Sequence, residues 1–275
     1  MARKRKPSGR GKKAKITLKV RSIEIQRRVQ SLAIGLFGRK FYLKKAKPLN
    51  PKLIIRRLHE AVSRKTPVNL VVFWGGAKKS PATLPDFAEE TTLMNLSNIK
   101  ENFEKIGVKT NITLLTMDIY EDVLNERPQK EIGTYITQIK KMAEQFDFNV
   151  QTFSEIYSRN GFNPKKLRPT ERKMQERVRI LYENIQKDAK VIERLRRLAR
   201  EHGKGNVEET VRKYVILHAF DDLILNRSLP DAIYISFGNP TTQKEISSLP
   251  TVFLYQNKEA GKAGELGVPW FTIKN

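Results

Sequence analysis

The residues best suited to chemistry in this chain follow an apolar run, Pro67 to Trp74, that is typical of a buried strand. The next segment, Gly75-Gly76-Ala77-Lys78-Lys79-Ser80-Pro81, supplies two glycines, two lysines and a hydroxyl. Glycines let a backbone approach a bound group, and lysines bind phosphate or carboxylate. The segment matches neither the P-loop nor the dinucleotide-binding pattern. Two interpretations therefore stay open: a ligand-binding loop, or a turn with two solvated lysines.

A carboxylate follows a second apolar run. Asp118 comes directly after Lys109 to Met117, and Asp122 lies one helical turn further on. The carboxyl ends of parallel strands meet at one edge of a sheet, so Asp118 would face the same crevice as the first loop and could orient an amine or a ribose hydroxyl. The alternative is structural, because an Asp in this position can cap the helix that starts at Ile119.

A third candidate group lies on one predicted helix. Tyr214, His218 and Asp222 are four residues apart and therefore share a face. They form either the wall of a polar pocket or the surroundings of a partly buried, hydrogen-bonded histidine. The second interpretation is the commoner one for such a pattern, and we favour it.

The composition excludes other kinds of chemistry. The 275 residues include no Cys, which excludes disulfides, thiolate nucleophiles and Cys-ligated zinc. The three histidines lack metal-ligand spacing, so we expect no metal and no other cofactor. No apolar run approaches the ~20 residues that span a bilayer, and the first residues lack the apolar core of a secretion signal. We expect a cytoplasmic protein with no membrane partner.

Positive charge is concentrated in two segments. Of the formal +24, the first 47 residues hold 17 Lys and Arg against one acid, and residues 164–213 hold 16 bases against 8 acids. Localised charge binds phosphate backbones through counterion release, although such a block is often only a solvated helix face. Read as one helix, the second segment places its arginines on one side. We expect nucleic-acid contacts from Arg3, Lys4, Arg5, Lys6, Lys12, Lys13, Arg172, Arg179, Arg194 and Arg197.

The alternation of strand and helix patterns predicts an α/β fold with a Rossmann-like, doubly wound, mostly parallel sheet. Strands are predicted at 67–74, 109–117, 148–153, 232–237, 251–255 and 270–273. Asn50-Pro51 predicts a helix start with Asn50 as its cap. The predicted organisation is a disordered basic arm (1–21), N-terminal helices (22–66), the first half of the Rossmann-like domain (67–163), a basic helical insertion (164–225) and C-terminal strands that complete the sheet (226–275).

The segment from Phe73 to Val123 resembles the isocyanide (isonitrile) synthase family, which includes the bacterial tyrosine and tryptophan isonitrile synthases and the fungal spore-wall maturation enzyme. The similarity lies in Lys79-Ser80-Pro81, in Leu84-Pro85-Asp86-Phe87-Ala88-Glu89, and in Met117-Asp118-Ile119-Tyr120-Glu121-Asp122. Around the late serine of the family, Ser236 here, members usually carry Arg before and His after. This chain has Tyr234 and Gly238, which fits a distant relative with altered or lost chemistry.

The resemblance implies a transferase that makes an isocyanide from the amino group of an amino acid and a carbon of a pentulose phosphate. An amino acid and a phosphorylated small molecule are then the expected partners. By this likeness the catalytic candidates are Lys79, Asp118 and Glu89. The substrate-binding candidates are Gly75, Gly76, Lys78, Ser80, Asp86 and Ser236. The alternative function is an RNA- or DNA-binding protein, with tRNA as one candidate, that holds phosphates with its basic arm and helices.

Overall fold

The computed structural model describes residues 10–37, 47–75, 85, 87–162, 172–202, 205–237, 243–244 and 247–254. These residues contain one sheet of five parallel strands in the order β3-β2-β1-β4-β5. The predicted α/β class with a Rossmann-like parallel sheet is confirmed. The strands are β1 (Val68–Trp74), β2 (Thr110–Thr116), β3 (Asn149–Thr152), β4 (Ile233–Ser236) and β5 (Thr251–Phe253).

The central strand β1 is apolar almost throughout because both of its faces are covered. Leu70, Val72 and Trp74 enter the core on one face of the sheet, and Val71 and Phe73 enter the core on the other. The alternation follows from the two-residue period of a strand. The sheet therefore separates two cores, and its strand ends are held from both sides.

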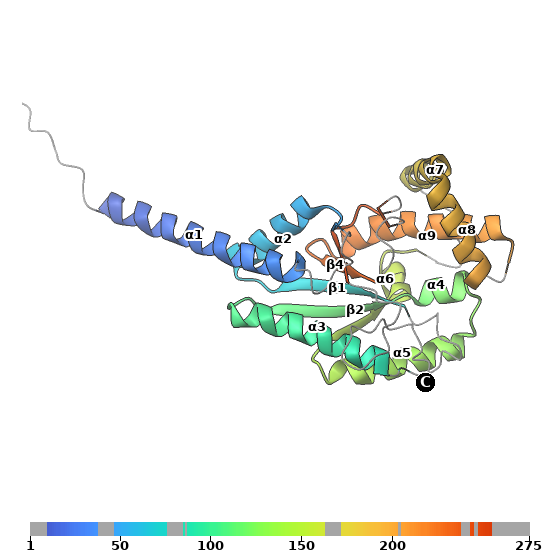
Figure 1. Cartoon of the computed structure of the whole chain (residues 1–275), viewed down its shortest axis with the longest axis horizontal. Helices are drawn as coiled ribbons and strands as arrows, with labels where there is room; N and C mark the ends of the chain where they lie inside the picture. Colours follow the sequence, from blue (N-terminus) through green and yellow to red (C-terminus); the bar gives the residue numbers. More distant parts are fainter. Residues whose placement is uncertain are drawn as a thin grey trace, which may run out of the picture.

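Two layers of helices cover the sheet (Figure 1). One layer consists of α1 (Arg10–Phe37), α2 (Pro51–Arg64), α3 (Phe87–Lys105) and α5 (Gln129–Glu144). The other consists of α4 (Asp118–Val123), α6 (Phe153–Arg159) and α9 (Val207–Ser228). The insertion between α6 and α9 forms α7 (Arg172–Lys187) and α8 (Ala189–His202), which pack on α9 around a small core of their own.

Helix α1 differs from the sequence prediction. The disordered arm predicted over 1–21 is corrected for residues 10–21, which belong to this helix, while residues 1–9 lie outside the described residues. Lys and Arg have long unbranched stems and favour helix, which explains why the basic segment can continue it. Only the second half packs on the body, through Val29, Leu32 and Leu36; the first half projects away from it (Figure 1).

Three local predictions are also corrected. The basic insertion is two helices and not one, because Asp188 accepts a hydrogen bond from Lys190 N (2.9 Å) and starts α8. The single helical wheel drawn through its arginines therefore does not apply. The strand predicted over 148–153 ends at Thr152, where α6 follows it directly and begins with a capping box of Thr152 and Glu155. The Asn50 side chain does not cap α2 but donates to the Ser248 carbonyl. The strand predicted at 270–273 lies outside the described residues.

Candidate functional site

The carboxyl ends of β1 and β2 lie side by side, as the proposed crevice requires. Trp74 and Thr116 are in register, and Met117 N donates to the Trp74 carbonyl over 3.0 Å. Gly75 therefore continues from the same edge at which Asp118 begins α4. The edge of a parallel sheet where strands end is the usual ligand site of such folds.

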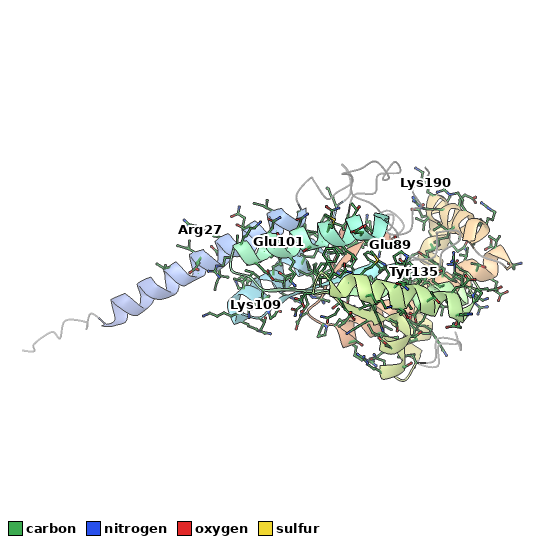
Figure 2. The ribbon with its side chains drawn as sticks, turned by 90° about the horizontal axis from the view of Figure 1, so that it is seen from below. Arg27, Glu89, Glu101, Lys109, Tyr135 and Lys190 are labelled. Atoms are coloured by element: carbon green, nitrogen blue, oxygen red, sulfur yellow. The ribbon has the colours of Figure 1, made fainter. Side chains whose placement is uncertain are left out.

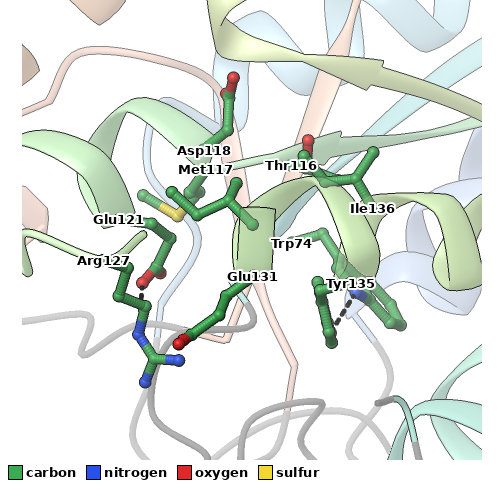
Figure 3. A pocket seen from close by; sticks show the side chains of 10 residues that line it. Trp74, Thr116, Met117, Asp118, Glu121, Arg127, Glu131, Tyr135 and Ile136 are labelled. Carbon is green, nitrogen blue, oxygen red and sulfur yellow. Dashed lines mark hydrogen bonds and ion pairs between the residues drawn. The ribbon is translucent and has the colours of Figure 1, made fainter. Parts of the chain in front are cut away.

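A pocket opens at this edge (Figure 3). It holds about 340 Å³ of empty space, counted out to its open mouth. One wall comes from the strand ends and α4, and the other comes from α5 and the turn before it. The lining residues are Trp74, Thr116, Met117, Asp118, Glu121, Arg127, Glu131, Ile132, Tyr135 and Ile136.

The pocket is acidic, with three carboxylates and one guanidinium. Arg127 Nε lies 3.4 Å from Glu121 Oε2, which also accepts from Asn125 Nδ2 (3.0 Å). The half-buried Glu131 makes no ion pair within the described part of the chain. A cation entering the pocket would therefore meet a carboxylate that is not already neutralised.

Asp118 has a role that the sequence did not suggest. Its Oδ1 accepts a hydrogen bond from Ser154 N (3.2 Å), in the first turn of α6, so it binds the start of a neighbouring helix as well as lying at the start of its own. Burial raises the pKa of this carboxyl, and the Ser154 hydrogen bonds oppose the shift. A half-buried carboxyl with a raised pKa at a strand end is well suited to bind an amine and exchange a proton with it.

Glu89 reaches the pocket only through another side chain. It is fully buried on α3, and its Oε1 accepts from Tyr135 Oη (3.0 Å), which in turn accepts from Trp74 Nε1 (3.1 Å). Burial, followed by the nearby Glu89 charge, raises the pKa of Tyr135 well above its usual value. Tyr135 and Trp74 line the pocket and were not predicted. Trp74 could have been noticed as the polar-edged residue that closes the strand.

The remaining predicted catalytic and substrate-binding residues divide into two groups. Ser236 ends β4 and is buried, and its Oγ donates to Gln243 Oε1 (2.7 Å); it does not line the pocket. The others lie outside the described residues: Gly76, Lys78, Lys79, Ser80 and Asp86. The structure thus brings Asp118 to the pocket, places Glu89 behind Tyr135, and keeps Ser236 apart.

The tyrosine–histidine group on α9 is part of the core. Asp221 accepts hydrogen bonds from Tyr120 and from Tyr157 (2.8 Å), and the His218 ring packs 4.4 Å from that of Tyr214. Burial lowers the pKa of His218 to about 3 and raises that of Asp221 to about 7. The burial in the favoured interpretation agrees with this packing, but the expected hydrogen bonding does not, because His218 Nε2 is buried without a hydrogen-bond partner among the described residues.

Asp222, the third residue of the predicted helix face, binds residues of α7 and of the segment before β5. Its Oδ2 pairs with Arg177 (2.7 Å), and it also accepts from Ser247 Oγ (2.8 Å) and Ser248 N (2.8 Å). It therefore joins the insertion and the segment before β5 to α9.

The four arginines of the insertion that were predicted to bind nucleic acid differ in their ion pairing and exposure. Arg179 pairs with Glu176 (2.7 Å) and Glu183 (2.6 Å), and burial lowers the pKa of Arg194. Arg172 and Arg197 are exposed. The predicted bases of the arm are split: Lys12 and Lys13 belong to the projecting half of α1, and Arg3, Lys4, Arg5 and Lys6 lie outside the described residues.

Among the described residues, no group of three or more His, Asp and Glu could hold a metal ion.

Comparison with known proteins supports the fold. The PvcA protein from Pseudomonas aeruginosa has a similar structure, with a TM-score of 0.54 and 15% identity over 74% of each chain. Two synthetases are less similar: tryptophanyl-tRNA synthetase from Aeropyrum pernix (TM-score 0.44, 11% identity, 78% of this chain and 54% of that one) and tyrosyl-tRNA synthetase from Pyrococcus horikoshii (0.45, 11%, 85% and 61%). No protein-family model matches, and no curated protein sequence is significantly similar. The fold implied by the resemblance to isocyanide synthases is thereby confirmed.

Proposed function

We propose that the pocket binds an amino-acid-type ligand and that the chain is an isocyanide-synthase-like enzyme or a degenerate relative of one. The observation that supports this most directly is that Glu131, which makes no ion pair among the described residues, lines the same pocket as the half-buried Asp118. These two carboxylates suit an ammonium group, and Arg127 suits a carboxylate. Ile132 and Ile136 offer an apolar wall for the ligand side chain.

The proposed chemistry starts at the amino group. An ammonium ion beside Asp118 favours the charged carboxylate, which then accepts a proton and leaves the nitrogen able to attack a carbonyl carbon. The phosphorylated co-substrate is assigned to the segment after β1, where Lys78, Lys79 and Ser80 supply cations and a hydroxyl. That assignment rests on the sequence and on the resemblance.

Calorimetric titration of the full chain tests the binding site. The probes are L-tyrosine and L-leucine, each with the matched ligand that lacks the amino group. Glu131→Gln removes the free carboxylate and should weaken amino-acid binding about tenfold or more, because a charge-assisted hydrogen bond is lost. The matched control is Glu144→Gln, an exposed position on the same helix outside the pocket. Equal loss in both variants, or no loss in Glu131→Gln, would contradict the site.

Turnover is a separate question. Mass spectrometry should show that the chain consumes an amino acid together with ribulose 5-phosphate, and Lys79→Ala should abolish that consumption. Binding without consumption would identify a degenerate relative that keeps the site and has lost the reaction.

A second candidate function is nucleic-acid binding, and helix α1 favours it. The helix has 28 residues with eight bases and a single acid, Glu24. Its projecting half has no packing partner among the described elements that would explain such a charge. This function would coexist with the pocket and does not replace it.

A further inference from the structure

We propose that α1 and the amino edge of the sheet form one nucleic-acid-binding surface, and that α7 and α8 are not part of it. The inference rests on the second candidate function above and names its surface. Besides α1 itself, the surface includes four exposed bases where α1 meets the body, which we call the basic edge: Arg27, Arg64, Lys65 and Lys109.

Three segments of the chain meet at the basic edge. A Cβ placed on Gly107 would lie 3.5 Å from Arg28 Nη1, so α1 touches the turn between α3 and β2. Val68 N donates to the Lys109 carbonyl (2.9 Å), which joins that turn to the one that contains Lys65. Figure 2 shows Arg27 and Lys109 at the end of the molecule from which α1 projects.

The bases of this edge are available to a partner. All four are exposed, and none makes an ion pair within the described residues. Two nearby acids are already paired with other bases: Glu24 with Arg28 (2.7 Å) and Glu101 with Lys105 (4.0 Å). The positive charge of α1 therefore continues onto the body.

The insertion differs from the basic edge because several of its bases form ion pairs with nearby acids. Four of them, and Lys213 of α9, form ion pairs within α7, α8 and α9, so much of its field is cancelled and a phosphate would have to displace a carboxylate. These pairs are Arg177–Asp222, Arg179 with Glu176 and Glu183, Arg196–Glu208, Arg200–Glu193 and Lys213–Glu209.

A nucleic-acid duplex fits this surface better than other anionic partners. The duplex presents about one charge per 1.7 Å, and α1 is about 42 Å long at 1.5 Å per residue, which corresponds to roughly 12 base pairs. Helices that bind anionic membranes carry aromatic residues on a broad apolar face, whereas Arg10 to Arg21 contains no aromatic residue and only Ile16, Leu18 and Val20 as larger apolar residues. No helix in the described ranges could cross a membrane either.

The test is fluorescence anisotropy of the full chain with a labelled 16-base-pair RNA duplex between 50 and 300 mM KCl. The edge variant combines Arg27→Gln, Lys65→Gln and Lys109→Gln. The matched control combines Lys173→Gln, Lys187→Gln and Lys190→Gln, which remove the same charge from exposed positions of α7 and α8. The edge variant should lower the log–log salt slope by about 2 and weaken binding at least tenfold at 100 mM KCl. The control should change affinity less than threefold.

Several results would overturn the proposal: no binding by the wild type at 50 mM KCl, equal loss in both variants, no loss in the edge variant, or tighter binding to phosphatidylglycerol vesicles than to the duplex. A DNA duplex of the same sequence shows which backbone is preferred, and either preference supports the surface. Amino-acid binding by the edge variant should match the wild type. Failure of this proposal and failure of the pocket are therefore distinguishable.

Discussion

Asp118 serves the fold and the pocket at the same time. One oxygen holds the first turn of α6, and the side chain lines the cavity at the strand ends. Its position could be predicted, because an Asp that follows an apolar run marks a strand end. Its partner could not, because Ser154 lies 36 residues later in the chain and meets it only in the folded sheet. Tyr135 was missed for the same reason: it lies within α5, where periodicity predicts only a buried position.

His218 and Asp221 should give the protein opposing pH dependences. The folded-state pKa of Asp221, about 7, exceeds its unfolded value near 3.9, so its stabilisation is full at low pH and is lost as the pH rises through 7. The pKa of His218, about 3, lies below its unfolded value near 6.5, so its stabilisation is full above that value and is lost as the pH falls towards 3. Between pH 4 and 6.5 the two effects oppose each other.

Removing either group should reveal the pH dependence of stability that the other group causes. In His218→Gln the free energy of unfolding should fall between pH 4.5 and 6.5 by roughly 1 kcal/mol per pH unit, and in Asp221→Asn it should rise by a similar amount. Urea unfolding at pH 4.5, 5.5 and 6.5 measures both slopes. Tyr234→Phe, which removes a hydroxyl from the same core, is the control and should keep the wild-type slope. Parallel slopes in all three variants would refute this account.

At the scale of elements, the strands were predictable and several helix ends were not. The first five predicted strands all form, because continuous apolar runs such as Val68–Trp74 have few other ways to be buried. Helix α6 is only seven residues long, so its periodicity is too short to recognise. The break at Asp188 depends on one capping side chain within a long helical pattern.

The two halves of α1 should differ in what they add to stability. Leu32 is fully buried against the body, whereas Val20 is 58% exposed on the projecting half. Leu32→Ala should lower the free energy of unfolding by about 2–5 kcal/mol, because it leaves a cavity in the core. Val20→Ala should change it by less than about 0.5 kcal/mol. Urea unfolding compares the two, and a large cost for Val20→Ala would mean that the first half also packs on the body.

At the scale of the whole molecule, the two proposed sites lie at opposite edges of one sheet. The pocket lies at the carboxyl ends of β1 and β2, and the basic edge lies at the amino end of β1. Seven residues of strand separate them by about 20 Å, which exceeds the Debye length of about 8 Å at physiological salt.

Occupation of one site should therefore leave the other unchanged. The dissociation constant for L-tyrosine, measured by calorimetry, should agree within twofold in the presence and absence of a saturating RNA duplex. A shift of fivefold or more would show that the edges are coupled. Because coupling is reciprocal, the same shift would then appear in the duplex affinity when L-tyrosine is saturating.

The strand order has a consequence for how the chain is made. β1 lies in the middle of the sheet, but Leu70 pairs with Ile233, which the ribosome adds only after most of the chain has emerged. During synthesis β1 can pair with β2 on one side while its other edge stays open. The pairing of β1 with β4 is therefore a late step, after which β5 can add to β4, and until then the exposed apolar strand is a binding target for chaperones.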